Sequence, residues 1–200
     1  MSVALVVLAA GASTRLGACK ALVDLGGTTP LARLLAAGRA CAGAPPLVVA
    51  GAHHAEIERA APAGVEVLLN PDWAAGRLGG LALASAARPD CDLCVAPVDV
   101  PLVPPEVFAA LCAAWDGAQS PPLGWLAPFV VRGDSERAYG HPFLLGRALA
   151  ARIASLGKDV PLRELRAHAA PLMSIQVDSV AILDDLDTRA DLDRLRRRIS

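Results

Sequence analysis

An apolar segment near the amino-terminal end leads directly into a polar loop that contains two glycines and two basic residues. Residues 3–20 read VALVVLAAGASTRLGACK, and the small and β-branched residues at the start predict a strand buried on both faces. The carboxyl end of such a strand is where open α/β sheets bind ligands. Gly11 and Gly17 let backbone amides approach phosphate oxygens. Since Arg15 and Lys20 add positive charge, the segment predicts a strand followed by a loop that holds a nucleotide. We call this loop, residues 10–20, the glycine loop.

The spacing of this loop excludes two common phosphate-binding motifs. A Walker loop has the pattern G-x-x-x-x-G-K-[ST], whereas here five residues separate Gly11 from Gly17 and Lys20 comes three positions later. The dinucleotide fingerprint G-x-G-x-x-G is absent as well, which disfavours an NAD-binding Rossmann domain. The alternative to a nucleotide-binding loop is a plain surface turn, but the two basic residues disfavour it.

Composition and charge predict one domain without affinity for polyanions. Of the 200 residues, 54% are hydrophobic and 20% charged, enough to bury a large core in a single unit, residues 1–200. The net charge of −1 provides no field that would attract nucleic acid or an anionic membrane. The basic run at 194–198 is explained by the favourable position of cations at the end of a helix. We therefore expect neither nucleic acid nor a membrane as a partner.

Neither a signal peptide nor a membrane span is predicted. No Lys or Arg precedes the first apolar run, and no segment approaches the roughly 20 uninterrupted apolar residues of a spanning helix. We therefore expect a cytoplasmic protein in which the five cysteines are reduced thiols. Cys91 and Cys94 lie in a predicted strand with side chains on opposite faces, which favours packing over a shared metal. Cys19, beside Lys20, is a candidate reactive thiol.

Apolar runs alternate with helix-like stretches, which predicts right-handed βαβ units in an α/β fold with a mostly parallel sheet. The expected strands are residues 3–9, 46–50, 65–69, 93–98 and 173–177. One helix is expected to begin near Pro30 and another near Pro104. A helix between them has Glu56 and Arg59 on its polar face, and two further helices are expected at residues 145–156 and 162–168. Thr188 and Asp191 predict a capping box for a final helix. Residues 116–142, rich in Gly, Pro and Ser around an apolar piece, are typical of a functional loop.

Acidic residues follow one predicted strand and precede the final helix. Asp99 lies in APVDVPL, residues 96–102, at the carboxyl end of an apolar strand aimed at the same sheet edge as the glycine loop. A hard cation such as Mg²⁺ would keep a carboxylate there ionised. The alternative is a hydrogen bond to neighbouring loop amides. Asp184, Asp185 and Asp187 precede the helix, where their charge is favourable to its dipole.

The pattern L-A-A-G-x-S-x-R-x-G-x-x-K at residues 8–20 closely resembles the signature loop of MobA-like nucleotidyltransferases, which include the enzymes that attach CMP or GMP to molybdopterin. The resemblance implies a Rossmann-like three-layer sandwich with a mostly parallel twisted sheet, of the nucleotide-diphospho-sugar transferase type. Residues 1–103 would form mainly the nucleotide-binding half and residues 104–200 mainly the acceptor-binding half. It implies nucleotide contacts from Leu8, Ala9, Ala10, Gly11, Ser13, Arg15, Gly17 and Lys20.

Two carboxylates match the metal ligands of this family. The D-x-P that follows an apolar strand resembles its metal-binding aspartate, which implies that role for Asp99. The segment LDDLDTRADL is similar to the family's D-[IV]-[DN]-T-x-x-D-L ending. The acid directly before Thr is the better match to the second ligand, which selects Asp187 with Asp185 as the alternative. Mg²⁺ is the implied cofactor.

The segment NPDWAAGRLGG, residues 70–80, is similar to a region of the family that helps to hold the base and ribose. The similarity implies nucleotide contacts from Asn70, Gly76 and Gly80. Gly79 and Gly80 stand where serines are frequent in the family. On its own residues, Asn70 fits a turn equally well.

The acceptor site is implied by two looser similarities. YGHPF is similar to the G-H-P segment of the cytidylyl-transferring members, which implies acceptor contacts from His141 and Pro142. LGKDVPLREL partly resembles the family's G-D-x-G-x-R loop, which implies contacts from Asp159 and Arg163. In that segment, Lys158 and Pro161 replace the glycines. His53 and His54 carry no motif and are expected to be structural.

Together these matches imply a magnesium-dependent nucleotidyltransferase of the EC 2.7.7 type, in which an acceptor phosphate attacks the α-phosphate of an NTP and pyrophosphate leaves. Lys20 would contact the α-phosphate and Arg15 the departing pyrophosphate. Ala10 favours CTP, because members that transfer CMP tend to have L-A-A-G where those that transfer GMP have L-A-G-G. The acceptor would be molybdopterin or another small phosphorylated compound. A GMP-transferring or sugar-phosphate enzyme and a non-catalytic nucleotide-binding module are the alternatives.

Overall fold

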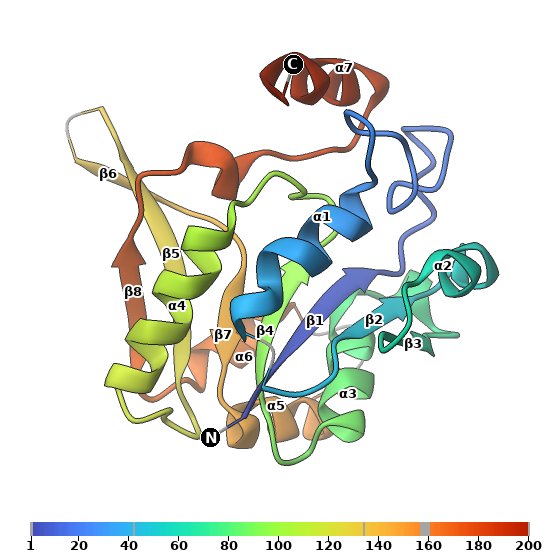
Figure 1. Ribbon diagram of the computed structural model, residues 1–200. Coiled ribbons are helices and arrows are strands. Elements are labelled where there is room, and N and C mark those ends of the chain that lie inside the picture. The colour runs from blue at the N-terminus through green and yellow to red at the C-terminus, as the bar shows by residue number, and fades with distance from the viewer. Residues whose placement is uncertain (1, 42, 134, 157–160, 200) are drawn as a thin grey trace.

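Eight strands form one open sheet in the computed structural model, which describes residues 2–41, 43–133, 135–156 and 161–199 (Figure 1). The strands are β1 (Val3–Ala9), β2 (Leu47–Ala50), β3 (Glu66–Leu69), β4 (Asp92–Pro97), β5 (Trp125–Arg132), β6 (Glu136–Tyr139), β7 (Phe143–Leu145) and β8 (Leu172–Gln176). Their order is β3-β2-β1-β4-β7-β5-β6, and β8 pairs with β5. The β1–β2, β2–β3, β1–β4 and β5–β8 pairs are parallel. The predicted α/β fold with a mostly parallel sheet is confirmed.

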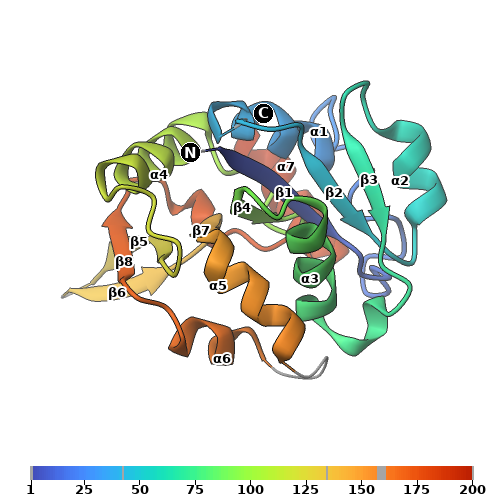
Figure 2. The same cartoon turned by 90° about the horizontal axis from the view of Figure 1, so that it is seen from below.

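Helices lie on both faces of this sheet. They are α1 (Pro30–Ala37), α2 (His54–Ala60), α3 (Arg77–Ala87), α4 (Pro105–Gly117), α5 (Arg147–Ala151), α6 (Leu162–Ala167) and α7 (Arg189–Ile199), with 3₁₀ turns η1 (Gly38–Cys41), η2 (Trp73–Ala75), η3 (Arg152–Ser155) and η4 (Val180–Leu183). Figure 2 shows α1 and α4 on one face and α3, α5 and α6 on the other. None of the described helices has the length and apolar character needed to cross a membrane.

Alternation along β1 explains why both faces are covered. Leu5 and Val7 belong to the apolar cluster that includes α1 and α4, whereas Ala4 and Val6 belong to the cluster that includes α3 and α5. Successive side chains of a strand point to opposite faces, so a strand that is apolar throughout needs cover on both sides. The burial of β1 on two faces, predicted from its sequence, is therefore explained by the three-layer arrangement.

The final helix packs against the glycine loop. Thr188 and Asp191 form the predicted capping box: the Asp191 N–H donates to Thr188 Oγ1 at 3.2 Å, and the Thr188 N–H donates to the Asp191 carboxylate at 2.9 Å. Hydrogen bonds from Thr188 and Arg194 hold the pKa of Asp191 well below its usual range. Leu192 and Leu195 of α7 share an apolar cluster with Leu16, Leu25 and Leu186. In Figure 1, α7 accordingly lies over the loops that follow β1.

The cysteines depart from one expectation. Cys41 of η1 and Cys112 of α4 form a disulfide, so the prediction that all five cysteines are reduced is wrong for this pair. They are 71 residues apart in the chain, and only the packing of α4 against η1 brings them together. Cys94 is buried in β4, where desolvation raises its pKa to about 12. Among the described residues, neither Cys91 nor Cys94 belongs to a group of potential metal ligands.

The segment rich in Gly, Pro and Ser holds more strand than its composition suggests. β6 pairs antiparallel with β5, from Phe129 opposite Tyr139 to Arg132 opposite Glu136. β7 pairs with both β4 and β5. β6 follows β5 directly in the chain, whereas β4, one partner of β7, lies far from it in sequence. Strand propensity depends strongly on such pairing, so local composition does not reveal β6 and β7.

Candidate active site

A cavity of about 240 Å³ opens at the carboxyl ends of the parallel strands. Its walls come from the ends of β1, β2 and β4 and from the segment that follows β3. In the sheet, β2 lies on one side of β1 and β4 lies on the other, so the strand order changes direction at β1. Open α/β sheets bind ligands at such a topological switch point. The lining residues are Leu8, Ala9, Ala10, Gly11, Ser13, Cys19, Lys20, Ala21, Val49, Asn70, Trp73, Gly76, Gly80, Pro97, Val98 and Asp99. Most of the predicted nucleotide-binding residues are thus brought together, with Asp99 among them.

The glycine loop folds back on itself around Ser13. This residue has a positive φ of 54°, an uncommon conformation for a side-chain-bearing residue. Its carbonyl accepts hydrogen bonds from the N–H groups of Leu16 and Gly17 at 3.1 and 3.0 Å, and its hydroxyl accepts one from the Lys20 N–H at 3.2 Å. Gly17 also has a positive φ, 75°. Backbone strain of this kind concentrates at binding sites. The hydrogen bonds of Ser13 hold the two ends of the loop together.

A close backbone contact joins the loop to the next strand. The Ala52 N–H donates to the carbonyl of Ala10 at 3.1 Å. A Cβ atom on Gly51 would lie 2.5 Å from that same carbonyl oxygen, which no real side chain permits. Gly51 is therefore required for this approach.

Asp187 bridges the two predicted phosphate-binding cations. Arg15 Nη2 donates to its Oδ2 at 2.7 Å, and Lys20 Nζ donates to its Oδ1 at 2.6 Å. The hydrogen bond from Lys20, reinforced by the charges of Lys20 and Arg15, lowers the pKa of Asp187. The carboxylate is therefore ionised at neutral pH, and both ion pairs are lost only as the pH falls through this depressed value. Arg15 and Gly17 do not line the cavity; Arg15 is joined to the lining residue Lys20 through Asp187.

The two predicted metal-binding aspartates come from neighbouring segments. The Leu186 N–H donates to the carbonyl of Asp99 at 2.7 Å, which places the residue before Asp187 against Asp99. Asp184 is buried and forms ion pairs with Arg194 and Arg198. Asp185 is exposed, and its carbonyl accepts a hydrogen bond from Arg194. Asp187, rather than Asp185, therefore lies beside the cavity. The carboxylates of Asp99 and Asp187 are oxygen ligands of the kind that Mg²⁺ prefers.

Asn70 presents a buried donor to the cavity. The residue is 2% exposed, and its Oδ1 accepts a hydrogen bond from the Asp72 N–H at 3.2 Å, as in a turn. Its Nδ2 has no hydrogen-bond partner within the described part of the chain. Because a buried unsatisfied amide is costly, this donor indicates a ligand with an oxygen or nitrogen acceptor. The amino end of α3, at Gly76 and Gly80, borders the same space and adds a favourable dipole for an anion.

The residues predicted to bind the acceptor are not gathered into the cavity. His141 lies two residues before Phe143, which pairs with Val95, so His141 and Pro142 lie near the carboxyl end of β4. The His141 N–H donates to the carbonyl of Ile182 at 3.0 Å. Arg163 is on α6, which leads into the amino end of β8, and its side chain is exposed away from the cavity lining. Asp159 and Lys158 lie outside the described residues.

Trp73 and Cys19 are among the lining residues that the predicted nucleotide set did not include. Trp73, in the η2 turn after β3, contributes an aromatic ring of the kind that stacks on a base. The signal was present in NPDW, where an aromatic follows Asn70. Cys19 lines the cavity from the glycine loop, and its pKa is raised because burial disfavours the thiolate.

These features define a nucleotide-binding α/β protein with an anion site at the carboxyl edge of its sheet. Over residues 5–172 the sequence matches the MobA-like NTP transferase domain, and the chain belongs to that family. Its activity is therefore of the nucleotidyltransferase type. A comparison with curated proteins gives no match.

Solved structures share the fold over nearly the whole chain. Rv0371c from Mycobacterium tuberculosis is 26% identical, with a TM-score of 0.81 over 98% of this chain and 97% of that one, and a second structure of it, complexed with manganese, is 24% identical with a TM-score of 0.77 over 98% and 99%. The molybdopterin-guanine dinucleotide biosynthesis protein A from Archaeoglobus fulgidus is 17% identical, with a TM-score of 0.71 over 98% of each chain. CMP:2-keto-3-deoxy-manno-octonic acid synthetase complexed with CTP is 15% identical, with a TM-score of 0.82 over 100% and 98%.

Proposed function

We propose that this chain transfers a nucleoside monophosphate, with CMP preferred, from an NTP to a small phosphorylated acceptor such as molybdopterin, releasing pyrophosphate. The observation that carries the proposal is the carboxylate of Asp187 held between Arg15 and Lys20 at 2.7 and 2.6 Å. Two cations that converge on one anionic group at the rim of a cavity form a site for phosphate oxygens. In the proposed complex the triphosphate takes these two cations and displaces Asp187.

The proposed reaction needs positioning and charge neutralisation more than proton transfer. An acceptor phosphate is already an anion at neutral pH, so no general base has to activate it. Lys20, whose side chain is only 12% exposed, contacts the reacting α-phosphate, and Arg15 offsets charge on the departing pyrophosphate. The strained turn at Ser13 holds the loop that carries both cations.

Asp99 and the displaced Asp187 hold the divalent cation in this proposal. Their carboxylates match the preference of Mg²⁺ for oxygen ligands, and the manganese in a structure of the mycobacterial relative supports a divalent ion. When bound, Mg²⁺ neutralises phosphate charge and orients the phosphates.

The preference for CTP rests on the wall of the cavity. Ala10 lines it, and its methyl group takes space that the smaller glycine of guanylyl-transferring members leaves free. The Nδ2 of Asn70 is a donor suited to an acceptor atom of the base or ribose, and Trp73 offers an aromatic face. His141 and Pro142, near the carboxyl end of β4, are the proposed acceptor contacts. The relative named for molybdopterin-guanine dinucleotide biosynthesis supports a molybdopterin acceptor.

The function is tested by following pyrophosphate release with Mg²⁺, each NTP in turn, and molybdopterin or a sugar phosphate as acceptor. We expect release only when an acceptor is present, fastest with CTP and molybdopterin. Fastest release with GTP, or with a sugar phosphate, would select one of the alternative enzymes. Nucleotide binding without release in any combination would contradict the proposal and favour a non-catalytic module.

Asp99→Asn is expected to raise the Mg²⁺ concentration needed for half-maximal pyrophosphate release by roughly tenfold or more, because the neutral amide is a weaker ligand for a hard cation. The measurement is a Mg²⁺ titration of the initial rate at saturating CTP. Asp72→Asn, a substitution outside the cavity lining, serves as the control. If the Mg²⁺ titrations of the Asp99 variant and the wild type coincide, Asp99 is not a metal ligand.

A further inference from the structure

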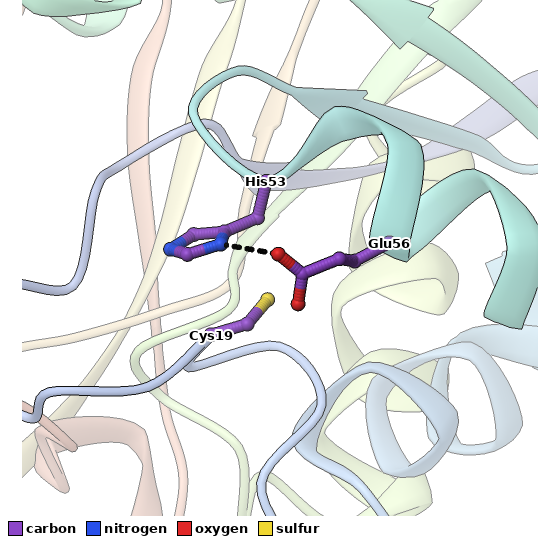
Figure 3. A group of neighbouring side chains, drawn as sticks. All are labelled: Cys19, His53 and Glu56. Carbon is purple, nitrogen blue, oxygen red and sulfur yellow. Dashed lines mark hydrogen bonds and ion pairs between the residues drawn. The ribbon is translucent and has the colours of Figure 1, made fainter.

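A thiol, an imidazole and a carboxylate meet beside the glycine loop. Cys19 comes from that loop, His53 directly precedes α2, and Glu56 lies in the first turn of α2 (Figure 3). One ligand atom from each residue lies within 4.8 Å of the other two. Figure 3 shows the sulfur of Cys19, on the glycine loop, pointing toward the Glu56 carboxylate and the His53 ring at the start of α2. This cluster takes no part in the proposed transfer reaction.

We infer that Cys19, His53 and Glu56 form a binding site for Zn²⁺, separate from the carboxylate site at Asp99 and Asp187. Thiolate, imidazole and carboxylate are the three ligand types that zinc takes in proteins, whereas Mg²⁺ prefers oxygen ligands alone. With zinc–ligand bonds of about 2.0–2.3 Å, tetrahedral donors lie about 3.3–3.8 Å apart. Nδ1 of His53 and Oε1 of Glu56 are already 3.0 Å apart, and all three donors lie within 4.8 Å of one another. The half-exposed Glu56 side chain can adjust to bring the donors to these distances.

The second nitrogen of His53 supports this assignment independently. Nε2 lies 3.2 Å from the carbonyl oxygen of Ala12, so it must carry a proton to make that hydrogen bond. Nδ1, 3.0 Å from Glu56 Oε1, then faces the site. A histidine that binds a metal through one nitrogen usually donates its other N–H to a carbonyl or carboxylate, which fixes the ring orientation. Ala12 provides that carbonyl here.

Zinc binding at this cluster would displace protons. Without metal, both ring nitrogens of His53 face oxygen atoms, of Glu56 and of Ala12. Zinc would take the place of the Cys19 thiol proton and of any proton on Nδ1 of His53. The resulting Zn²⁺ with one thiolate and one carboxylate carries no net charge, so it neither attracts nor repels a nucleotide strongly.

Zinc at this position would connect both arms of the glycine loop to α2. Cys19 is a ligand on one arm, and Ala12 on the other arm is held through His53. Cys19 also lines the cavity. The bound ion is therefore expected to restrict the loop and to protect the Cys19 thiol from alkylation. The inference does not depend on the proposed function, since it is tested without nucleotide.

The test is a Co²⁺ titration of the full-length, metal-free protein, with Co²⁺ as a spectroscopic probe for zinc. We expect a thiolate-to-cobalt charge-transfer band that saturates at one Co²⁺ per chain and disappears when Zn²⁺ is added. Cys19→Ser should abolish the band, and Glu56→Gln should weaken Zn²⁺ binding by at least roughly tenfold. The matched controls are Cys91→Ser, a change at another free thiol, and Glu58→Gln, a change on the same helix; both should retain the band. Asp99→Asn should retain it as well.

Two results would overturn the inference. One is the absence of a sulfur-to-cobalt band in the wild type. The other is a band that persists in Cys19→Ser or that responds equally to Glu56→Gln and Glu58→Gln. If Cys19→Ser fails to fold, the Glu56 and Glu58 pair still decides, because both side chains are exposed and their replacement leaves the core untouched. Circular dichroism of the metal-free variants checks that each is folded.

Discussion

Replacing Lys20 by alanine is expected to lower the rate of pyrophosphate release by roughly 10²–10³-fold, the usual cost of removing one preorganised charge-stabilising donor. The Nζ of Lys20 lies at the cavity, 2.6 Å from Asp187, with a side chain that is 12% exposed. In the proposed complex it faces the α-phosphate, where the charge changes during the reaction. Its loss should therefore reduce kcat more than the affinity for CTP.

The measurement is the initial rate of pyrophosphate release with CTP and the acceptor, together with circular dichroism to show that the variant is folded. Lys20→Arg, which keeps the charge with a different donor geometry, should recover part of the rate. Arg132→Ala removes an exposed cation at the end of β5 and should leave the rate unchanged. Release by a folded Lys20→Ala protein at the wild-type rate would show that Lys20 does not contact the reacting phosphate.

Replacing Asp92 by alanine is expected to lower the free energy of unfolding by about 3–5 kcal/mol, the cost of breaking a buried charged network. Asp92 is fully buried at the amino end of β4. Its carboxylate accepts hydrogen bonds from Trp115 Nε1 and from the Arg147 N–H, both at 2.9 Å, and the Arg147 guanidinium lies 3.7 Å away. The substitution would strand a buried indole N–H and would uncouple α4 and α5 from the sheet.

Urea denaturation gives this free energy, and Asp90→Ala, a change at an exposed residue two positions earlier, is the matched control. The control should remain close to the wild type, because single surface substitutions seldom matter. Asp92 lies at the opposite end of β4 from Asp99, so the variant should retain its pyrophosphate release at temperatures where it is folded. Equal stabilities of the Asp92 and Asp90 variants would contradict the structural role of the buried network.

Strands β1 to β4, β8 and the glycine loop could be predicted because their causes are local, whereas β6 and β7 were not predicted. β1 is apolar at every position, which requires cover on both faces, and the loop after it must lie at the carboxyl edge. The same reasoning placed Asp99 after β4, and parallel strands bring their carboxyl ends together. Thr188 and Asp191 could be predicted as a capping box because the motif spans only four residues.

Features that depend on contacts between distant segments could not be read from the sequence. The disulfide between Cys41 and Cys112 depends on η1 lying against α4. His53 has no motif, and only the close approach of the glycine loop to α2 brings it to Cys19. The buried role of Asp92 likewise depends on Trp115, which lies 23 residues later.

A prediction from resemblance was less informative where the sequence departs from the family pattern. Arg163 was selected from a loop in which Pro161 and Lys158 replace the expected glycines, and the structure does not bring Arg163 to the cavity. Lys20 and Asp187, which match their motifs without such replacement, contact each other. A motif residue is therefore better supported when the backbone-determining residues around it match as well.

The central claim is that Arg15 and Lys20 hold the phosphates of a nucleotide at the site where Asp187 now lies. A crystal structure with Mg²⁺ and a non-hydrolysable CTP analogue tests it most directly. We expect the triphosphate in the cavity, with Arg15 and Lys20 on its oxygens and Asp187 released from both. A nucleotide bound elsewhere, with both cations still paired to Asp187, would contradict the account.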